Sequence, residues 1–149
     1  MIDIDGILTV SSHEQLPLIE NARIVVINGY IGSIDSAYQQ ALCTFVERGG
    51  GVLFLGNAVE AYQGYELLGM LTGATRGIRT PRCELIARVS TPDHYITRRV
   101  DPSLAFLESA YLLTDIPPDA QPLWQTSWQY VTHTLTYVRD YGRGRVFCM

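Results

Sequence analysis

The chain has 149 residues, 47% of them hydrophobic, and carries a formal net charge of −4. This length fits one domain with a sizeable core, so we interpret residues 1–149 as a single domain. The acidic balance excludes the broad basic field that attracts nucleic acid or an anionic membrane surface. No apolar run approaches the roughly 20 residues of a membrane span, so we expect neither nucleic acid nor a membrane as a partner.

The cysteines and the first residues indicate a reducing compartment. Cys43, Cys83 and Cys148 are odd in number, lie far apart and form no CxxC pair, which argues against a disulfide framework or a zinc site. The opening segment MIDIDGILTV carries acids where a secretory signal carries bases. We therefore expect a cytoplasmic protein.

The front half predicts a strand, a helix and a second strand, after a short β-rich segment at residues 6–10. Residues 22–29 form a continuous apolar run, typical of a strand covered on both faces. Residues 33–48 carry apolar side chains at helical spacing and end at glycines, and residues 52–55 form a second apolar run. Such a unit has parallel strands. Three residues are possible N-caps of the helix: Ser33, Asp35 and Ser36.

The chain changes character after this unit. Residues 58–73 predict a helix that is interrupted near Gly64, and residues 83–90 alternate like a half-buried strand. The remainder is rich in Thr, Tyr, Val and Trp and lacks helical periodicity. We expect four more strands there, as an antiparallel extension, near residues 108–114, 121–126, 134–139 and 145–148.

Three segments occur in an order that resembles a known family: FVERGGGVLFLGNA, DHYITRRVDPSLAFLESAY and YVRDYGRGRVFCM. Together they resemble the trehalose-utilisation (ThuA-like) family over roughly residues 24–149. The resemblance implies an α/β fold of the class I glutamine amidotransferase type, which is a flavodoxin-like three-layer sandwich with a mainly parallel sheet. Here the antiparallel extension follows in the C-terminal half. Family members continue at both ends, so the chain is similar to the middle of the family domain.

The chain departs from this family at positions where chemistry is expected. Amidotransferases carry a cysteine nucleophile at the tip of the strand that matches residues 52–55, and ThuA-like proteins usually carry a histidine just after it. Gly56-Asn57 stands there instead. A His-Pro pair of the family is His94-Tyr95 here, and an Asp-Glu pair is Glu108-Ser109, with Tyr111 kept. We therefore expect no amidotransferase catalysis.

Asn57 is the first candidate for ligand contact, because ligands of doubly wound sheets gather at the carboxyl ends of the strands. Its amide offers two donors and an acceptor to a sugar or a carboxylate. The alternative is a turn asparagine that tolerates a positive φ. Glu60 points the same way if a helix starts at Ala58, or it is an exposed acid that the helix dipole favours.

His94, Glu108 and Tyr111 complete the candidate ligand-binding set. The resemblance implies that His94 could meet Glu108 across the end of the sheet, and a loop histidine with a local hydrogen bond is the alternative. The three histidines of the chain are well separated and form no HExxH pattern, so we expect no metal. The glycines at 49–51 leave a helix and enter a strand, the wrong polarity for a phosphate loop, so we expect no cofactor.

Three functions stay open. The first is a domain without catalysis that binds a small polar ligand, such as a sugar, near Asn57. The second is an enzyme of carbohydrate metabolism with a pocket around Asn57 and His94. The third is an assembly module, because a sheet that lacks outer strands presents unpaired edges to another chain. The trimmed length and the plentiful aromatic residues favour a homodimer.

Overall fold

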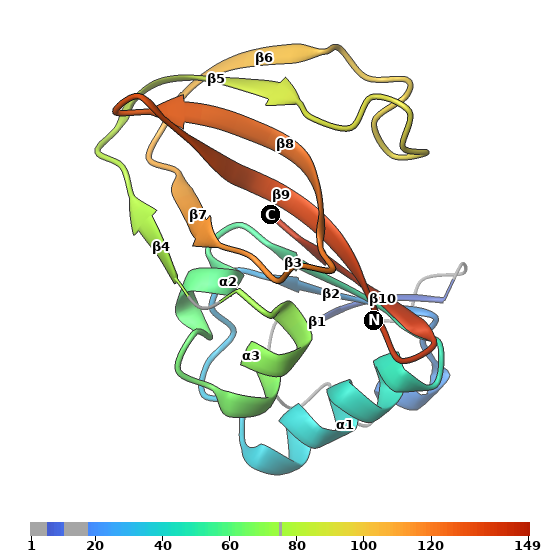
Figure 1. The fold of residues 1–149 in the computed structure, drawn as a ribbon. Coiled ribbons are helices and arrows are strands. Elements are labelled where there is room, and N and C mark those ends of the chain that lie inside the picture. The colour runs from blue at the N-terminus through green and yellow to red at the C-terminus, as the bar shows by residue number, and fades with distance from the viewer. Residues whose placement is uncertain (1–5, 11–17, 75) are drawn as a thin grey trace. The chain divides into compact units, whose positions relative to one another are not determined.

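The structure is a computed structural model that describes residues 6–10, 18–74 and 76–149 (Figure 1). The contacts within it divide the chain into two compact units. Unit 1 comprises Met1–Gly73 and Arg139–Met149, and unit 2 comprises Ala74–Val138. The interpretation of the chain as one domain stays a prediction.

Unit 1 contains parallel strands in the order β1-β2-β3-β10. Their bounds are β1 (Ile7–Val10), β2 (Ile24–Asn28), β3 (Gly51–Leu55) and β10 (Gly144–Cys148). The register aligns one side chain of each strand in a row on the same face, and two such rows are buried to 1% exposure or less. The rows are Leu8, Val25, Val52 and Val146, then Val10, Ile27, Phe54 and Cys148. This apolar face is the core of unit 1.

Helix α1 (Ser36–Glu47) joins β2 to β3 and completes the predicted strand–helix–strand unit, whose strands are parallel. Asp35 is the N-cap: its Oδ1 accepts a 2.8 Å hydrogen bond from the Tyr38 N–H, which satisfies a free donor of the first turn. The interrupted helix after β3 is confirmed as α2 (Ala58–Ala61) and α3 (Glu66–Thr72). Helices α1 and α3 contact each other, and both contact β10. None of the helices in the described ranges is long and apolar enough to cross a membrane.

A junction of glycines closes the amino-terminal end of the parallel strands. Gly144, the first residue of β10, lies so close to the carbonyl oxygens of Val46 and Gly50 that a Cβ would collide with both. The neighbouring Arg145 N–H donates a 3.2 Å hydrogen bond to Gly50 O. The joint between α1 and β3 is thereby fixed to the start of β10.

Unit 2 is built of antiparallel strands. β9 pairs with β8, β8 with β5, and β5 with β6, while β7 pairs with both β4 and β9. The bounds are β4 (Arg76–Arg79), β5 (Cys83–Val89), β6 (Ser103–Glu108), β7 (Tyr111–Asp115), β8 (Gln121–Trp128) and β9 (Val131–Tyr141). The last residues of β9 belong to unit 1. Buried apolar side chains from several strands form the core of unit 2: Leu85, Ala87, Leu112, Leu123 and Tyr137.

The predicted α/β fold, with parallel strands in front and antiparallel strands in the second half, is confirmed. Two details of the sequence interpretation are wrong. The strand expected at 108–114 is two strands, β6 and β7, because Ser109 and Ala110 bond to Thr80 between them: Ser109 Oγ donates to Thr80 O at 2.6 Å, and the Ala110 N–H donates to Thr80 Oγ1 at 3.1 Å. The segment 145–148, expected in the antiparallel extension, is β10 and runs parallel to β3.

The turn between β8 and β9 holds two residues other than glycine in left-handed backbone. Gln129 and Tyr130 have φ of 50° and 66°, and Trp128 pairs with Val131 around them. A two-residue hairpin loop with both φ positive favours Asn-Gly, because other L-residues cost about 1–2 kcal/mol each in this region. Tyr130 is fully exposed, so its ring gains no burial in return.

We expect Tyr130→Gly to raise the free energy of unfolding by about 1 kcal/mol, because glycine adopts a positive φ without the Cβ penalty. Urea denaturation measures the change. Tyr130→Ala is the matched control, since it removes the ring but keeps the Cβ, and should change stability by less than about 0.5 kcal/mol. Equal gains in both variants would assign the effect to the ring and contradict the backbone argument.

We expect Gly144→Ala to lower the free energy of unfolding by about 2–3 kcal/mol, because the new methyl group meets two backbone carbonyls that are fixed by their own hydrogen bonds. Gly69→Ala is the control: it lies within α3 with open space for a Cβ, and should raise stability by about 0.5–1 kcal/mol. Denaturation of both variants under the same conditions tests the pair. A Gly144→Ala variant as stable as the parent chain would disprove the junction.

Candidate functional site

The carboxyl ends of β2 and β3 carry the same two residue types in opposite order. β2 leads into Asn28-Gly29, and β3 leads into Gly56-Asn57. The strands are parallel neighbours, and Asn28 pairs with Leu55, so the two dipeptides meet at one edge of the sheet. We name Asn28, Gly29, Gly56 and Asn57 the amide edge. Ligands of parallel α/β sheets bind at the carboxyl ends of the strands.

The two glycines of the amide edge make room for the two amides. A Cβ on Gly29 would lie 2.9 Å from Asn57 Oδ1, and a Cβ on Gly56 would lie 3.3 Å from Asn28 Oδ1. Both glycines also have a positive φ, 74° for Gly29 and 64° for Gly56. The Gly29 N–H donates to Leu55 O at 2.9 Å and ties the two turns together. Each asparagine therefore lies against the glycine of the other strand, and both asparagines are exposed.

Asn57 begins α2 but does not cap it with its side chain. Its φ is −94°, and its amide makes no capping hydrogen bond, while its carbonyl oxygen accepts from the Ala61 N–H at 2.9 Å. The alternative that Asn57 serves to supply a positive φ is therefore wrong, because Gly56 does so. Glu60 is half-buried in the first turn of α2. The structure thus brings Asn57 and Glu60 together within one helical turn.

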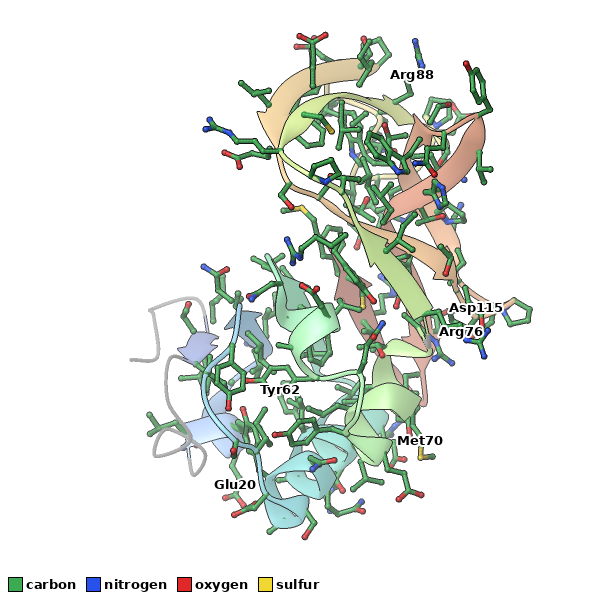
Figure 2. All side chains as sticks on the ribbon, turned by 90° about the vertical axis from the view of Figure 1, so that its left-hand side faces the viewer. Glu20, Tyr62, Met70, Arg76, Arg88 and Asp115 are labelled. Atoms are coloured by element: carbon green, nitrogen blue, oxygen red, sulfur yellow. The ribbon has the colours of Figure 1, made fainter. Side chains whose placement is uncertain are left out.

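Tyr62 fixes the segment that follows β2. Its hydroxyl accepts a 2.8 Å hydrogen bond from the Ile31 N–H and donates one of 3.2 Å to Gly32 O. The side chain is 2% exposed, and Figure 2 shows it inside unit 1. Burial raises the pKa of the Tyr62 hydroxyl, and the hydrogen bond from Ile31 opposes that rise. The hydroxyl therefore keeps the proton that it donates to Gly32.

Two further tyrosine rings flank Tyr62. The Tyr30 ring lies 5.9 Å from it between centroids, tilted by 33°, and the Tyr65 ring lies 5.3 Å away and nearly edge-on. Tyr30 directly follows Gly29 of the amide edge, and 59% of it is exposed. An exposed ring one residue beyond the amide edge, together with the side-chain amides, suits a small polar ligand that also has an apolar face.

His94 lies in unit 2, in the loop between β5 and β6, and is half-buried. Its Nδ1 accepts a 3.3 Å hydrogen bond from the Ile96 N–H, and its ring lies 4.5 Å from that of Tyr95. Its carbonyl oxygen accepts from the Thr97 and Arg98 N–H groups, both at 2.9 Å. All of these hydrogen bonds join His94 to residues within four positions of it in the chain. They agree with the alternative that His94 is a loop histidine with local hydrogen bonds.

Glu108 and Tyr111 also lie in unit 2, on either side of a two-residue connection. Glu108 is the exposed last residue of β6, paired with Cys83. Tyr111 begins β7 opposite Arg79, whose guanidinium carbon lies 5.9 Å from the centre of the tyrosine ring. Roles for His94, Glu108 and Tyr111 in ligand binding stay predictions. Within the described ranges, no group of three or more His, Cys, Asp or Glu residues could hold a metal ion.

Sequence reasoning missed Asn28, Tyr30 and Tyr62. A signal for Asn28 was present, because the Asn-Gly after the first apolar run mirrors the Gly-Asn after the second. Tyr62 gave no such signal, since its hydrogen-bond partners lie 31 and 30 residues away in the chain. Tyr62 meets Ile31 and Gly32 only in the folded chain, where the end of α2 lies beside the segment that follows β2.

Comparison with known proteins gives a family and a fold. A family model described as trehalose utilisation (ThuA) matches residues 9–149. No relative is found among curated proteins. A cytoplasmic protein from Salmonella typhimurium is 18% identical with a TM-score of 0.65, and the match covers 91% of this chain and 63% of that one.

Two other solved structures are similar. A ThuA-like protein from Parabacteroides merdae is 13% identical with a TM-score of 0.72, and the match covers 88% of this chain and 60% of that one. A β-galactosidase from Bacillus circulans is 13% identical with a TM-score of 0.63, covering 87% of this chain and 20% of that one. At these identities the likeness establishes the flavodoxin-like fold alone. The chain spans about three fifths of the length of the Salmonella and Parabacteroides proteins.

Tyr38 and Tyr62 form a matched pair for mutation, because both are 2% exposed but their hydroxyls differ. The Tyr38 hydroxyl has no hydrogen-bond partner in the part of the chain that the structure describes. We expect Tyr38→Phe to raise the free energy of unfolding by about 1 kcal/mol, and Tyr62→Phe to lower it by about 1–3 kcal/mol, since Ile31 and Gly32 lose their partner. Urea denaturation at neutral pH measures both, and effects of the same sign would contradict the contrast.

The pair also gives a pH readout. Burial raises the pKa of both hydroxyls, so above about pH 10 the unfolded chain loses protons that the folded chain retains. The stability contributed by these groups is fully present below about pH 10 and is lost as the pH rises further. Each phenylalanine variant should show a shallower loss of stability above that pH than the parent chain.

Proposed function

This chain belongs to the trehalose-utilisation (ThuA) family, and from that premise we propose that it binds a small polar ligand, a sugar, at the amide edge without amidotransferase catalysis. The observation that carries the proposal is that Asn28 and Asn57 each lie against the glycine of the other strand, at the carboxyl ends of two adjacent parallel strands. Two exposed side-chain amides at one edge of the sheet offer both donors and acceptors, and sugar hydroxyls can donate to and accept from such groups.

The neighbouring groups suit the same ligand class. Tyr30 follows Gly29 of the amide edge and has an exposed ring, and a ring of this kind packs on the apolar face of a sugar. Glu60 adds an acceptor in the first turn of α2. The β-galactosidase among the structural neighbours is consistent with a carbohydrate context but is similar in fold alone.

Cys43 and Cys148 argue against thiol catalysis. A catalytic cysteine must be exposed and easily ionised. Cys43 is buried, its Sγ donates to Leu67 O at 3.5 Å, and burial raises the pKa of its thiol. Cys148 is buried as well, within β10. The tip after β3 carries Gly56, Asn57 and Ala58, none of which is a nucleophile.

We keep three further elements as proposals. His94, Glu108 and Tyr111 contribute to ligand binding, and an enzyme of carbohydrate metabolism is the second candidate function. The protein acts in the cytoplasm. It acts as a homodimer, and the surface that would form this dimer is argued in the next subsection.

We expect trehalose, galactose or mannose, titrated at millimolar concentrations, to shift the side-chain amide NMR signals of Asn28 and Asn57. Asn57→Ala should weaken binding about tenfold, the effect of losing one or two hydrogen bonds. Asn21→Ala is the matched control, because Asn21 is exposed but precedes the amino-terminal end of β2, and it should leave the affinity unchanged.

Two results would contradict the proposal. One is the absence of any amide shift at Asn28 and Asn57 with all three sugars. The other is an equal loss of affinity in Asn21→Ala and Asn57→Ala, which would place the sugar elsewhere. Turnover of a sugar that His94→Ala abolishes would instead select the second candidate function.

A further inference from the structure

Strand β6 presents an edge that is open to pairing. It pairs with β5 on one side over Cys83–Arg88, and it ends the order of strands with no partner on its other side among the described residues. Figure 1 shows it beside β5. Five of its six residues are exposed, including Leu104 at 58% and Leu107 at 56%. An edge of this kind is a template for another strand.

This edge lacks the usual protection. Natural proteins blunt edge strands with lysine, proline, a bulge or an inward-pointing charge. The segment SLAFLE contains no lysine or proline, and its only charge is Glu108 at the end. Its pairing with β5 runs without a register shift. The backbone of β6 is therefore regular enough to accept a second strand over its full length.

One hydrogen bond shows which backbone groups of β6 face outward. The Val89 N–H donates to Pro102 O at 2.9 Å, so the backbone of Pro102 points toward β5. In an antiparallel ladder this direction alternates along the strand. The backbone N–H and C=O groups of Ser103, Ala105 and Leu107 therefore point away from β5, toward the open edge.

These outward groups fit a second copy of the same strand. In a two-fold antiparallel pair, residues opposite one another must lie on the same face, so a residue of β6 serves as the centre of symmetry. With Ala105 at the centre, Ala105 pairs with Ala105 of the second copy, and Ser103 pairs with its Leu107. All three outward residues then exchange both of their backbone hydrogen bonds. Leu104 comes to lie opposite Phe106 of the second copy, and both apolar side chains lose exposure.

The charges on β5 agree with this register. Glu84, Ile86 and Arg88 form the exposed face of β5, and they pair with Leu107, Ala105 and Ser103. The two-fold axis through Ala105 places Arg88 of one copy in the same row as Glu84 of the other, and brings Ile86 in line with its own counterpart. One β6 residue of each copy lies between these two charges, so they are three strand spacings apart, about 14 Å. The register therefore places opposite rather than like charges at each end of the interface, without an ion pair. Figure 2 shows Arg88 projecting from unit 2.

We propose that β6 is the dimerisation strand of this protein, pairing antiparallel with β6 of a second copy about a two-fold axis at Ala105. The proposal gives a surface and a register to the homodimer of the proposed function and does not depend on ligand binding at the amide edge. Sugar binding can fail while dimerisation succeeds, and the reverse also holds, so the two proposals are separable.

Cross-linking tests the register. Cys83→Ser first removes the one cysteine that is not buried. In that background, Ala105→Cys places two thiols across a hydrogen-bonded pair, with Cα atoms about 5.5 Å apart, within disulfide range. Ser103→Cys is the matched control on the same exposed strand, since the two copies of position 103 lie four residues apart along the strands, about 14 Å. Mild oxidation should give a covalent dimer with Ala105→Cys and at least tenfold less with Ser103→Cys.

Light scattering of the full chain gives an independent readout. The parent chain should have twice the mass of one chain, and Ala105→Pro should have the mass of one, because it removes an outward N–H that the β5 ladder does not use. Circular dichroism checks that Ala105→Pro is folded. A monomeric parent chain would overturn the proposal and leave the edge to another partner. Equal cross-linking at positions 103 and 105, or a folded Ala105→Pro dimer, would also overturn it.

Discussion

The close contact between Gly144 and the joint that leads from α1 into β3 is the constraint on which unit 1 depends. The backbone of β10 reaches the carbonyl oxygens of Val46 and Gly50 only because position 144 has no side chain. The Arg143 N–H then bonds to Glu47 O at 3.1 Å, and the Arg145 N–H to Gly50 O. This contact fixes the start of β10 beside the start of β3. It also fixes the carboxyl end of α1 at the amino-terminal end of both strands.

This contact explains why the family resemblance predicts the fold of this chain better than its ligand-binding residues. The segments ERGGG and YGRGRVF, which carry much of the resemblance, are the two sides of the glycine junction. They are packing motifs, and they lie at the end of the strands opposite to the end where ligands bind. A chain can therefore keep them, and with them the fold, while the residues at the carboxyl ends change. Gly56-Asn57 at the tip of β3 is such a change, so kinship predicts the architecture of this chain better than its chemistry.

The sequence predicted those elements whose side chains are buried on a regular period. The apolar runs of β2 and β3 and the alternation of β5 have this property, and these strands are confirmed. Helix α1 is confirmed as an element, but Ala37 and Ala41 of its apolar stripe are exposed, and Tyr38 and Cys43 are buried in their place. β4 and most of β6 were not predicted, because exposed strands carry no such period and their pairing partners lie at least 15 residues away in the chain. At the site, Asn57 was predicted from its place after a strand. Tyr62 could not be, because its hydrogen bonds to Ile31 and Gly32 exist only in the folded chain.

The amide edge and the β6 edge differ in which groups are left for a partner, and this difference decides what each can bind. At the amide edge the backbone is used internally: the Gly29 N–H bonds to Leu55 O, and the Ile31 N–H bonds to Tyr62. Side-chain amides and a ring remain, and such groups recognise a small molecule by its own pattern of hydroxyls. At β6 the backbone itself remains, in a periodic array that only another extended strand can satisfy. A ligand site and an assembly site can therefore coexist in one short chain without competing for the same groups.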